Sequence, residues 1–116
     1  SLLLEGIEKM QATSASMEDI RVADRELIWN TDLIETMELE NLMINAMSTV
    51  CSAENRHESR GAQAREDYPD RDDENWMKHT LAWTDERYGI SIDYRPVHSQ
   101  TLTDEVEAIP PKARTY

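Results

Sequence analysis

Residues 30–50 read NTDLIETMELENLMINAMSTV and carry the strongest periodic pattern in the chain. Apolar residues recur there at the i, i+3 and i+4 positions of one helix face, and glutamates lie between them. Asn30, Thr31 and Asp32 precede the pattern, and their short side chains can accept the free amide hydrogens of a helix start. We therefore expect a long helix that ends between Arg56 and Ser59. Its apolar residues are Leu33, Ile34, Met37, Leu39, Leu42, Met43, Ala46, Met47 and Val50.

The N-terminal stretch supplies a partner for this apolar face. Residues 2–10 place Leu3, Leu4, Ile7 and Met10 at helical spacing, which predicts an amphipathic helix packed antiparallel on the long one. Residues 11–16 are small and polar, and they predict a break. After the break, the spacing from Ser16 to Asp19 resembles a capping box and predicts a short turn of helix.

The pattern changes after Gly61. Residues 68–75 are charged, contain a proline and predict a loop. Residues 76–83 are rich in strand-forming side chains, and residues 90–95 alternate apolar and polar side chains. These two runs predict an antiparallel β-hairpin with a turn at residues 84–89. Residues 96–116, which include Pro110 and Pro111, predict an extended tail on the surface.

Together these elements predict an α+β fold in a single domain of 116 residues. Residues 1–60 are expected to form a small helical bundle of about three helices. Residues 61–116 are expected to form a C-terminal β-containing segment, the hairpin and the extended tail, packed on that bundle. Packing is required because an isolated two-stranded hairpin is at best marginally stable in water.

The composition of the chain disfavours several classes of partner. It has 24 acidic and 12 basic residues, and its formal net charge of −12 repels nucleic-acid phosphates and anionic lipid surfaces. Cys51 is the only cysteine, so the chain can form neither an intrachain disulfide nor a thiolate metal cluster. Its apolar runs are far shorter than the roughly 18 to 20 residues of a membrane span. We expect a soluble domain with no nucleic-acid partner and no direct membrane insertion.

No catalytic, cofactor-binding or metal-binding constellation is predicted. Cys51 lies at the apolar edge of the long helix, which favours a buried small hydrophobe over a reactive thiol. Residues 70–74 are acidic but lack the glycine and closing glutamate of a calcium loop, so a solvated loop is favoured. The three glycines are too dispersed to form a phosphate-binding turn. Ordinary polar roles are expected for His57, His79 and His98, and packing roles for Trp29, Trp76 and Trp83.

Residues 58–67 read ESRGAQARED, so arginines and acids alternate around a glycine at the end of the long helix. The planar guanidinium group pairs with carboxylates or backbone oxygens through two donors. The segment therefore predicts either an ordered crossing between elements or domains, or a solvated and salt-bridged helix end. The residues alone favour neither alternative. The candidate domain-interface residues are Glu58, Arg60, Arg65 and Asp67.

Several linked motifs extend this segment over nearly the whole chain. They are NTDLIETMEL at residues 30–39, ESRGA at 58–62, RED at 65–67, DRDDENW at 70–76, KHTL at 78–81 and PPKARTY at 110–116. In this order they resemble the C-terminal domain of the succinate dehydrogenase flavoprotein subunit, in the fumarate reductase family. Gln63 departs from the family, whose members often carry His there, so no role is carried over to this side chain.

The resemblance implies a parent that oxidises succinate to fumarate on covalently attached FAD and passes electrons to an iron-sulfur subunit, beside a quinone-reducing membrane anchor. In the family the flavin-linking and substrate-binding residues belong to preceding domains, and none maps onto this sequence. The resemblance therefore implies a non-catalytic domain without a cofactor of its own, with a role in packing and assembly against the FAD-binding domain. It also implies a peripheral location at the cytoplasmic face of a bacterial inner membrane, or at the mitochondrial matrix face.

Two other hypotheses follow from the residues. The chain could be a free-standing helical interaction module that binds a partner helix through a methionine-rich stripe of Met37, Met43 and Met47. Alternatively, the isolated domain could self-associate, because a surface built to face another domain is exposed when that domain is absent.

Overall fold

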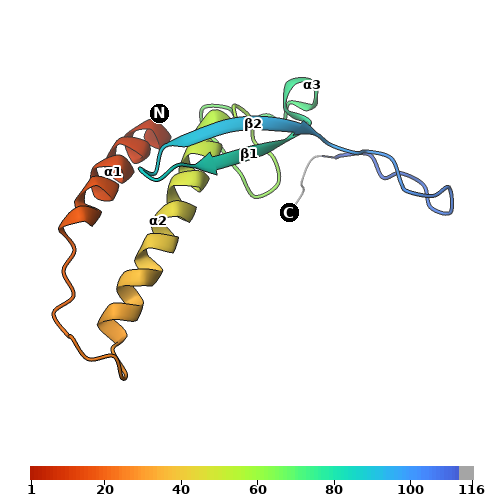
Figure 1. The fold of residues 1–116 in the computed structure, drawn as a ribbon. Helices are drawn as coiled ribbons and strands as arrows, with labels where there is room; N and C mark the ends of the chain where they lie inside the picture. Colours follow the sequence, from red (N-terminus) through yellow and green to blue (C-terminus); the bar gives the residue numbers. More distant parts are fainter. Residues whose placement is uncertain (113–116) are drawn as a thin grey trace.

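Two antiparallel helices and a β-hairpin form the main body of the described residues, 1–112, in the computed structural model (Figure 1). Helix α1 spans Leu2–Ser16 and helix α2 spans Thr31–Asn55. The one-turn helix α3, Asp73–Trp76, leads into strand β1, Lys78–Thr84, which pairs with strand β2, Ile90–Pro96. This arrangement confirms the predicted α+β class. None of the helices in residues 1–112 is both long and apolar enough to cross a membrane.

Asn30 fixes the start of α2, as the sequence predicted. Its Oδ1 accepts a hydrogen bond from the backbone N–H of Leu33 at 2.8 Å. Its Nδ2 donates to the carbonyl oxygens of Asp24 at 3.1 Å and Glu26 at 2.7 Å, so the side chain also orders the preceding loop. The helix ends at Asn55, one residue before the predicted range, because Arg56 adopts an extended backbone conformation.

Helix α1 is longer than predicted, and the break expected at residues 11–16 is wrong. The hydroxyl groups of Thr13, Ser14 and Ser16 donate to carbonyl oxygens three or four residues earlier in the same helix, which keeps these polar residues helical. The predicted short turn follows as a 3-10 helix at Met17–Asp19. Ser16 does not cap it through its side chain, because its hydroxyl bonds the carbonyl of Thr13.

The core lies where α1 and the hairpin pack on α2. Met43 and Met47 of α2 are buried, with 4% and 2% of their surface exposed. A Cβ atom at Gly6 would lie 3.6 Å from Cγ2 of Val50, so α1 and α2 approach each other closely there. The hydroxyls of Ser48 and Thr84 lie 3.0 Å apart and join α2 to β1. The C-terminal half of α2 therefore packs against both α1 and β1.

The hairpin has the predicted strands with shifted edges. Lys78 pairs with Pro96 and Thr84 with Ile90 in a continuous antiparallel register. Residues 73–76 were expected to be loop or strand but form α3 instead. The reason is Asp72, whose carboxylate accepts the backbone N–H groups of Glu74 at 3.1 Å and Asn75 at 3.0 Å and so caps a helical turn.

The predicted packing role of the tryptophans holds for one of the three. Trp76 is half-buried, whereas Trp83 is 53% exposed and Trp29 is 94% exposed. Residues 97–112 form neither helix nor strand and are largely exposed, in agreement with the predicted tail. The last four residues of that tail, and of the PPKARTY motif, lie outside the described residues.

Candidate functional site

Glu58 lies at the centre of the candidate site, directly after the end of α2, and its surface is completely buried. Its Oε1 accepts from the Nε atoms of Arg56 and Arg60, both at 2.8 Å. Its Oε2 accepts from Nη2 of Arg60 at 3.0 Å and from the backbone N–H of Asp72 at 2.9 Å. Burial alone raises the pKa of Glu58, but these hydrogen bonds outweigh it and lower the pKa below its ordinary value.

Arg56 connects this buried carboxylate to the hairpin. Its Nη1 donates to the carbonyl oxygen of Lys78 at 3.0 Å and to Oγ1 of Thr80 at 3.1 Å. Its Nη2 donates to the carbonyl oxygens of Trp76 and Lys78. One guanidinium therefore joins the end of α2, the end of α3 and the start of β1. Arg56 was not among the site residues predicted from the sequence, although it stands two positions before Glu58, as Arg60 stands two after.

Arg60 connects the same carboxylate to the start of α3. Its Nη2 lies 2.6 Å from Oδ1 of Asp73 and 3.3 Å from the carbonyl oxygen of Asp72. The pairing with Glu58 raises the pKa of Arg60, so the ion pair stays charged. Arg60 also opens a tight turn, in which its backbone N–H and C=O bond those of Gln63 at 2.9 and 3.0 Å. Gly61 has a φ of 57° in this turn, a conformation that favours glycine.

Arg65 caps the C-terminal end of α2, and only 6% of its surface is exposed. Its Nη1 donates to the carbonyl oxygens of Ala53 at 3.1 Å and Glu54 at 2.5 Å, which are free acceptors at the C-terminal end of α2. Its Nε and Nη2 form a bidentate pair with Asp67 at 2.9 and 2.7 Å. The C-terminal end of a helix carries a partial negative charge, so a positive charge is favourable there. Arg65 therefore supplies hydrogen bonds to the last carbonyl oxygens of α2 and also offsets this charge.

Aromatic rings contact two of these arginines, since Arg56 lies over Trp76 and Arg65 over Tyr68. The rings of His57 and Tyr68 stack at 4.7 Å, and Trp76 meets the edge of both His57 and Tyr94 at 6.0 Å. The guanidinium of Arg65 lies 4.9 Å from the ring centre of Tyr68. His57 is thus part of an aromatic cluster, and no group of metal-ligating side chains occurs among residues 1–112.

The structure therefore divides the predicted residues into two adjoining clusters. Glu58 and Arg60 belong to the first, which also contains Arg56, Asp72 and Asp73. Arg65 and Asp67 form the second. Gln63 joins the two, because its Nε2 donates to the carbonyl oxygens of Ala53 at 3.3 Å and Arg56 at 3.2 Å. Four donor side chains and one backbone N–H thus organise the chain between α2 and β1, namely those of Arg56, Arg60, Gln63 and Arg65 and the amide of Asp72.

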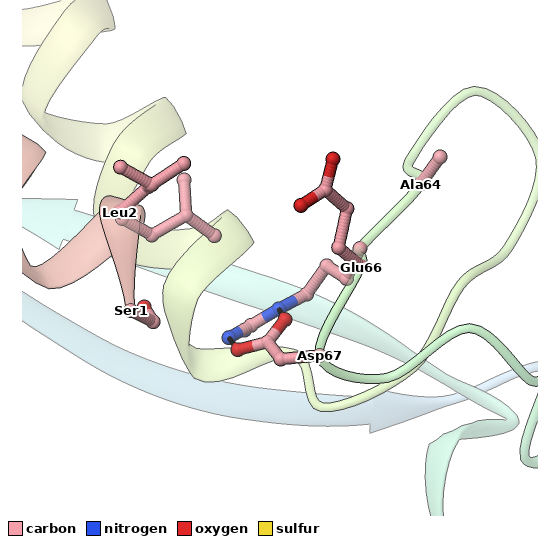
Figure 2. Close-up of a pocket in the computed structure, with 7 residues that line it drawn as sticks. Ser1, Leu2, Ala64, Glu66 and Asp67 are labelled. Carbon is pink, nitrogen blue, oxygen red and sulfur yellow. Dashed lines mark hydrogen bonds and ion pairs between the residues drawn. The ribbon is translucent and has the colours of Figure 1, made fainter.

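A groove borders the cluster of Arg65 and Asp67. This groove, of about 430 Å³, separates the start of α1 from the segment that carries Arg65, and Figure 2 shows Ser1 and Leu2 facing the stretch with Ala64, Glu66 and Asp67.

Cys51, one turn before the end of α2, is half-buried and so less buried than predicted. Burial, with the charge of Glu54, raises the pKa of its thiol, which disfavours the reactive thiolate.

Comparison with known proteins places this chain in a family. Residues 1–116 match the family described as fumarate reductase flavoprotein C-term. The mitochondrial succinate dehydrogenase [ubiquinone] flavoprotein subunit of Oryza sativa is 56% identical over 115 residues, which is 98% of this chain and 18% of the relative. The succinate dehydrogenase flavoprotein subunit of Rickettsia bellii is 53% identical over 99% of this chain and 19% of its own length.

A solved structure has the same fold. A variant of E. coli quinol fumarate reductase FrdA superposes with a TM-score of 0.82 at 32% sequence identity, over 99% of this chain and 19% of that one. The chain thus spans about one fifth of the length of these relatives. Full coverage by the family, high identity and the shared fold agree. The chain belongs to the C-terminal domain family of succinate dehydrogenase and fumarate reductase flavoprotein subunits.

Proposed function

We propose that this domain is the non-catalytic C-terminal domain of a succinate dehydrogenase flavoprotein subunit, and that it acts in packing and assembly. The observation that carries the proposal is the fully bonded carboxylate of Glu58, whose donors come from the residue that follows α2, the turn at residues 60–63 and the residue that caps α3. All four hydrogen bonds to this buried carboxylate come from the domain itself, so its role is to hold the elements of the domain together. The same holds for Arg65, whose donors are bonded to α2 and Asp67.

The proposal also gives a role to the four candidate interface residues. Glu58 and Arg65 are buried inside the domain and serve as supports, whereas Arg60 and Asp67 keep 25% and 45% of their side chains exposed. The exposed atoms of Arg60 and Asp67, held in place by their buried partners, are the ones available to contact the FAD-binding domain. The clusters therefore orient an interface as well as ordering the chain.

In the parent, FAD belongs to the preceding domains, which oxidise succinate to fumarate. The electrons pass to an iron-sulfur subunit and a quinone-reducing membrane anchor. The domain lies beside the FAD-binding domain on the cytoplasmic face of a bacterial inner membrane, or on the matrix face in mitochondria. The names of the relatives support this assignment, since they are succinate dehydrogenase flavoprotein subunits from a mitochondrion and from bacteria.

The test uses the full-length flavoprotein with its iron-sulfur subunit. Glu58→Gln keeps the shape but removes the charge that two arginines face, and Glu66→Gln, at an exposed position of the same segment, is the matched control. We expect Glu58→Gln to lower the yield of assembled complex by about tenfold or more, as for a broken buried pair, while turnover per bound flavin stays unchanged. Loss of turnover per flavin in a fully assembled complex would show that the site takes part in catalysis.

The coding sequence provides an independent check. The proposal requires a continuous reading frame upstream of Leu2 that encodes a Gly-rich FAD-binding domain. A stop codon followed by a start codon there would favour the free-standing interaction module. That alternative loses part of its surface in any case, because Met43 and Met47 of its methionine stripe are buried in the core and Met37 alone is exposed.

A further inference from the structure

The connection between α1 and α2 presents three consecutive large apolar residues to solvent. Leu27, Ile28 and Trp29, here called the apolar knob, are 87%, 77% and 94% exposed. The connection lies at the end of the helix pair that is remote from the hairpin (Figure 1). A single exposed apolar residue on a protein surface is ordinary, but three in succession with a tryptophan mark a contact surface.

The backbone of the knob is held in an unfavourable conformation. Trp29 has a φ of 57°, in the left-handed region that bulky residues rarely adopt. The buried side chain of Asn30 holds this conformation in place. Its amide donates to the carbonyl oxygens of Asp24 and Glu26, and its Oδ1 accepts from the N–H of Leu33. The carbonyl oxygen of Trp29 also accepts from the N–H of Thr31 at 3.1 Å. Such strain persists only where the surroundings impose it, and it commonly marks functional segments.

The knob borders a groove with a definite chemical character. The groove has a volume of about 380 Å³, and its lining includes Leu27, Trp29, Leu33 and Ile34. Glu35 and Glu38 also line it, and within residues 1–112 no lysine or arginine does. An apolar floor beside two carboxylates suits an apolar segment that carries a basic residue.

We propose that the apolar knob and its groove dock an apolar segment, with a neighbouring Lys or Arg, from the part of the same flavoprotein polypeptide that lies outside these 116 residues. The inference rests on the proposed function and names a second surface, apart from Arg60 and Asp67, through which the domain meets the rest of its subunit. About four fifths of the matched relatives lies outside the aligned region, which supplies the occupant. A second copy of this chain fits poorly, because its Glu35 and Glu38 would face the same carboxylates in a chain of net charge −12.

Hydroxyl-radical footprinting of the unmodified full-length flavoprotein tests the docking without any substitution. In this chain by itself Trp29 is more exposed than Trp83, at 94% against 53%. Docking reverses that order, so Trp29 is expected to oxidise more slowly than Trp83, because its ring is then removed from water. Faster oxidation of Trp29 than of Trp83 would overturn the proposal.

Photo-cross-linking identifies the occupant. The photoreactive residue p-benzoylphenylalanine is placed at position 29 of the full-length flavoprotein, and at the fully exposed position of Leu102 as the control. Position 29 is expected to yield a link within one polypeptide, to an apolar segment beside a Lys or Arg outside the 116 residues. A link to a second copy, to another subunit or to no fixed site overturns the inference. If one of these results is found and Glu58→Gln still lowers the yield of assembled complex, the proposed function stands while the inference fails.

Discussion

The guanidinium of Arg60 meets the buried carboxylate of Glu58 side-on, with Nε 2.8 Å from Oε1 and Nη2 3.0 Å from Oε2. This two-point contact fixes the angle between the end of α2 and the turn that begins at Arg60. The same guanidinium then reaches Asp73 at the start of α3. Arg60 therefore positions the start of α3, while Arg56 holds the end of α3 and the start of β1.

Arg60→Lys is expected to destabilise this junction by about 1–3 kcal/mol, because a lysine keeps the charge but cannot make the two parallel bonds. The measurement is hydrogen exchange at the amide of Asp72, which donates to Glu58 and reports directly on the carboxylate. Exchange there should accelerate by about tenfold or more. Arg95→Lys, on the exposed part of β2, is the control and should leave that amide unchanged.

Arg65→Gln is expected to fray the last turn of α2, since it removes the donors that reach the carbonyl oxygens of Ala53 and Glu54. Faster hydrogen exchange in a peptide covering residues 50–56 is the expected signal, with a loss of about 1–3 kcal/mol. Asp67→Asn is the matched variant, because it weakens the ion pair of Arg65 and leaves the cap in place. Equal effects of the two variants would show that the ion pair, and not the cap, stabilises the helix end.

The sequence predicted the elements whose signals are local. The apolar spacing after Asn30 and the alternation after Gly89 gave α2 and β2, because both patterns depend on neighbours within one element. Helix α1 was cut short at residue 10 because hydroxyl groups that bond backward along a helix have the same sequence pattern as a loop. Helix α3 was missed because one side chain, Asp72, decides between loop and helical turn.

The site was predicted in part for the same reason. The alternation of Arg and acid around Gly61 identified Glu58, Arg60, Arg65 and Asp67, since these residues lie within one short segment. It did not identify Asp72 and Asp73, which are twelve or more positions from Arg60 and join it only through the fold. The structure also places Trp29 in solvent, because its surroundings in this chain offer no surface to cover it.

Asn30→Ala is expected to destabilise the start of α2 by about 1–2 kcal/mol, which is the usual cost of losing a helix cap. The same change releases the loop at residues 24–29, because the amide of Asn30 bonds two of its carbonyl oxygens. Hydrogen exchange of residues 24–34 should rise as one unit. Asn45→Ala is the control, since Asn45 is an exposed residue in the middle of α2 that bonds only the carbonyl oxygen of Asn41 through its amide.

Glu58 is expected to make the domain sensitive to acid. Its pKa in the folded state lies below the ordinary value of 4.5, so its contribution to stability is fully present above pH 4.5 and is lost as the pH falls through the folded pKa. The carboxylates of Asp72 and Asp73 also have lowered pKa values, so a matched variant is needed to isolate Glu58.

Glu58→Gln provides that comparison, because it cannot ionise. The difference in melting temperature between the natural protein and Glu58→Gln should be constant at pH 5.5–7, on the plateau about one unit or more above that value. It should then shrink as the pH falls below 4.5, since protonation turns Glu58 into a neutral group like glutamine. A difference that stays constant down to acid unfolding would mean that Glu58 is held by shape alone and that its charge contributes nothing to the junction.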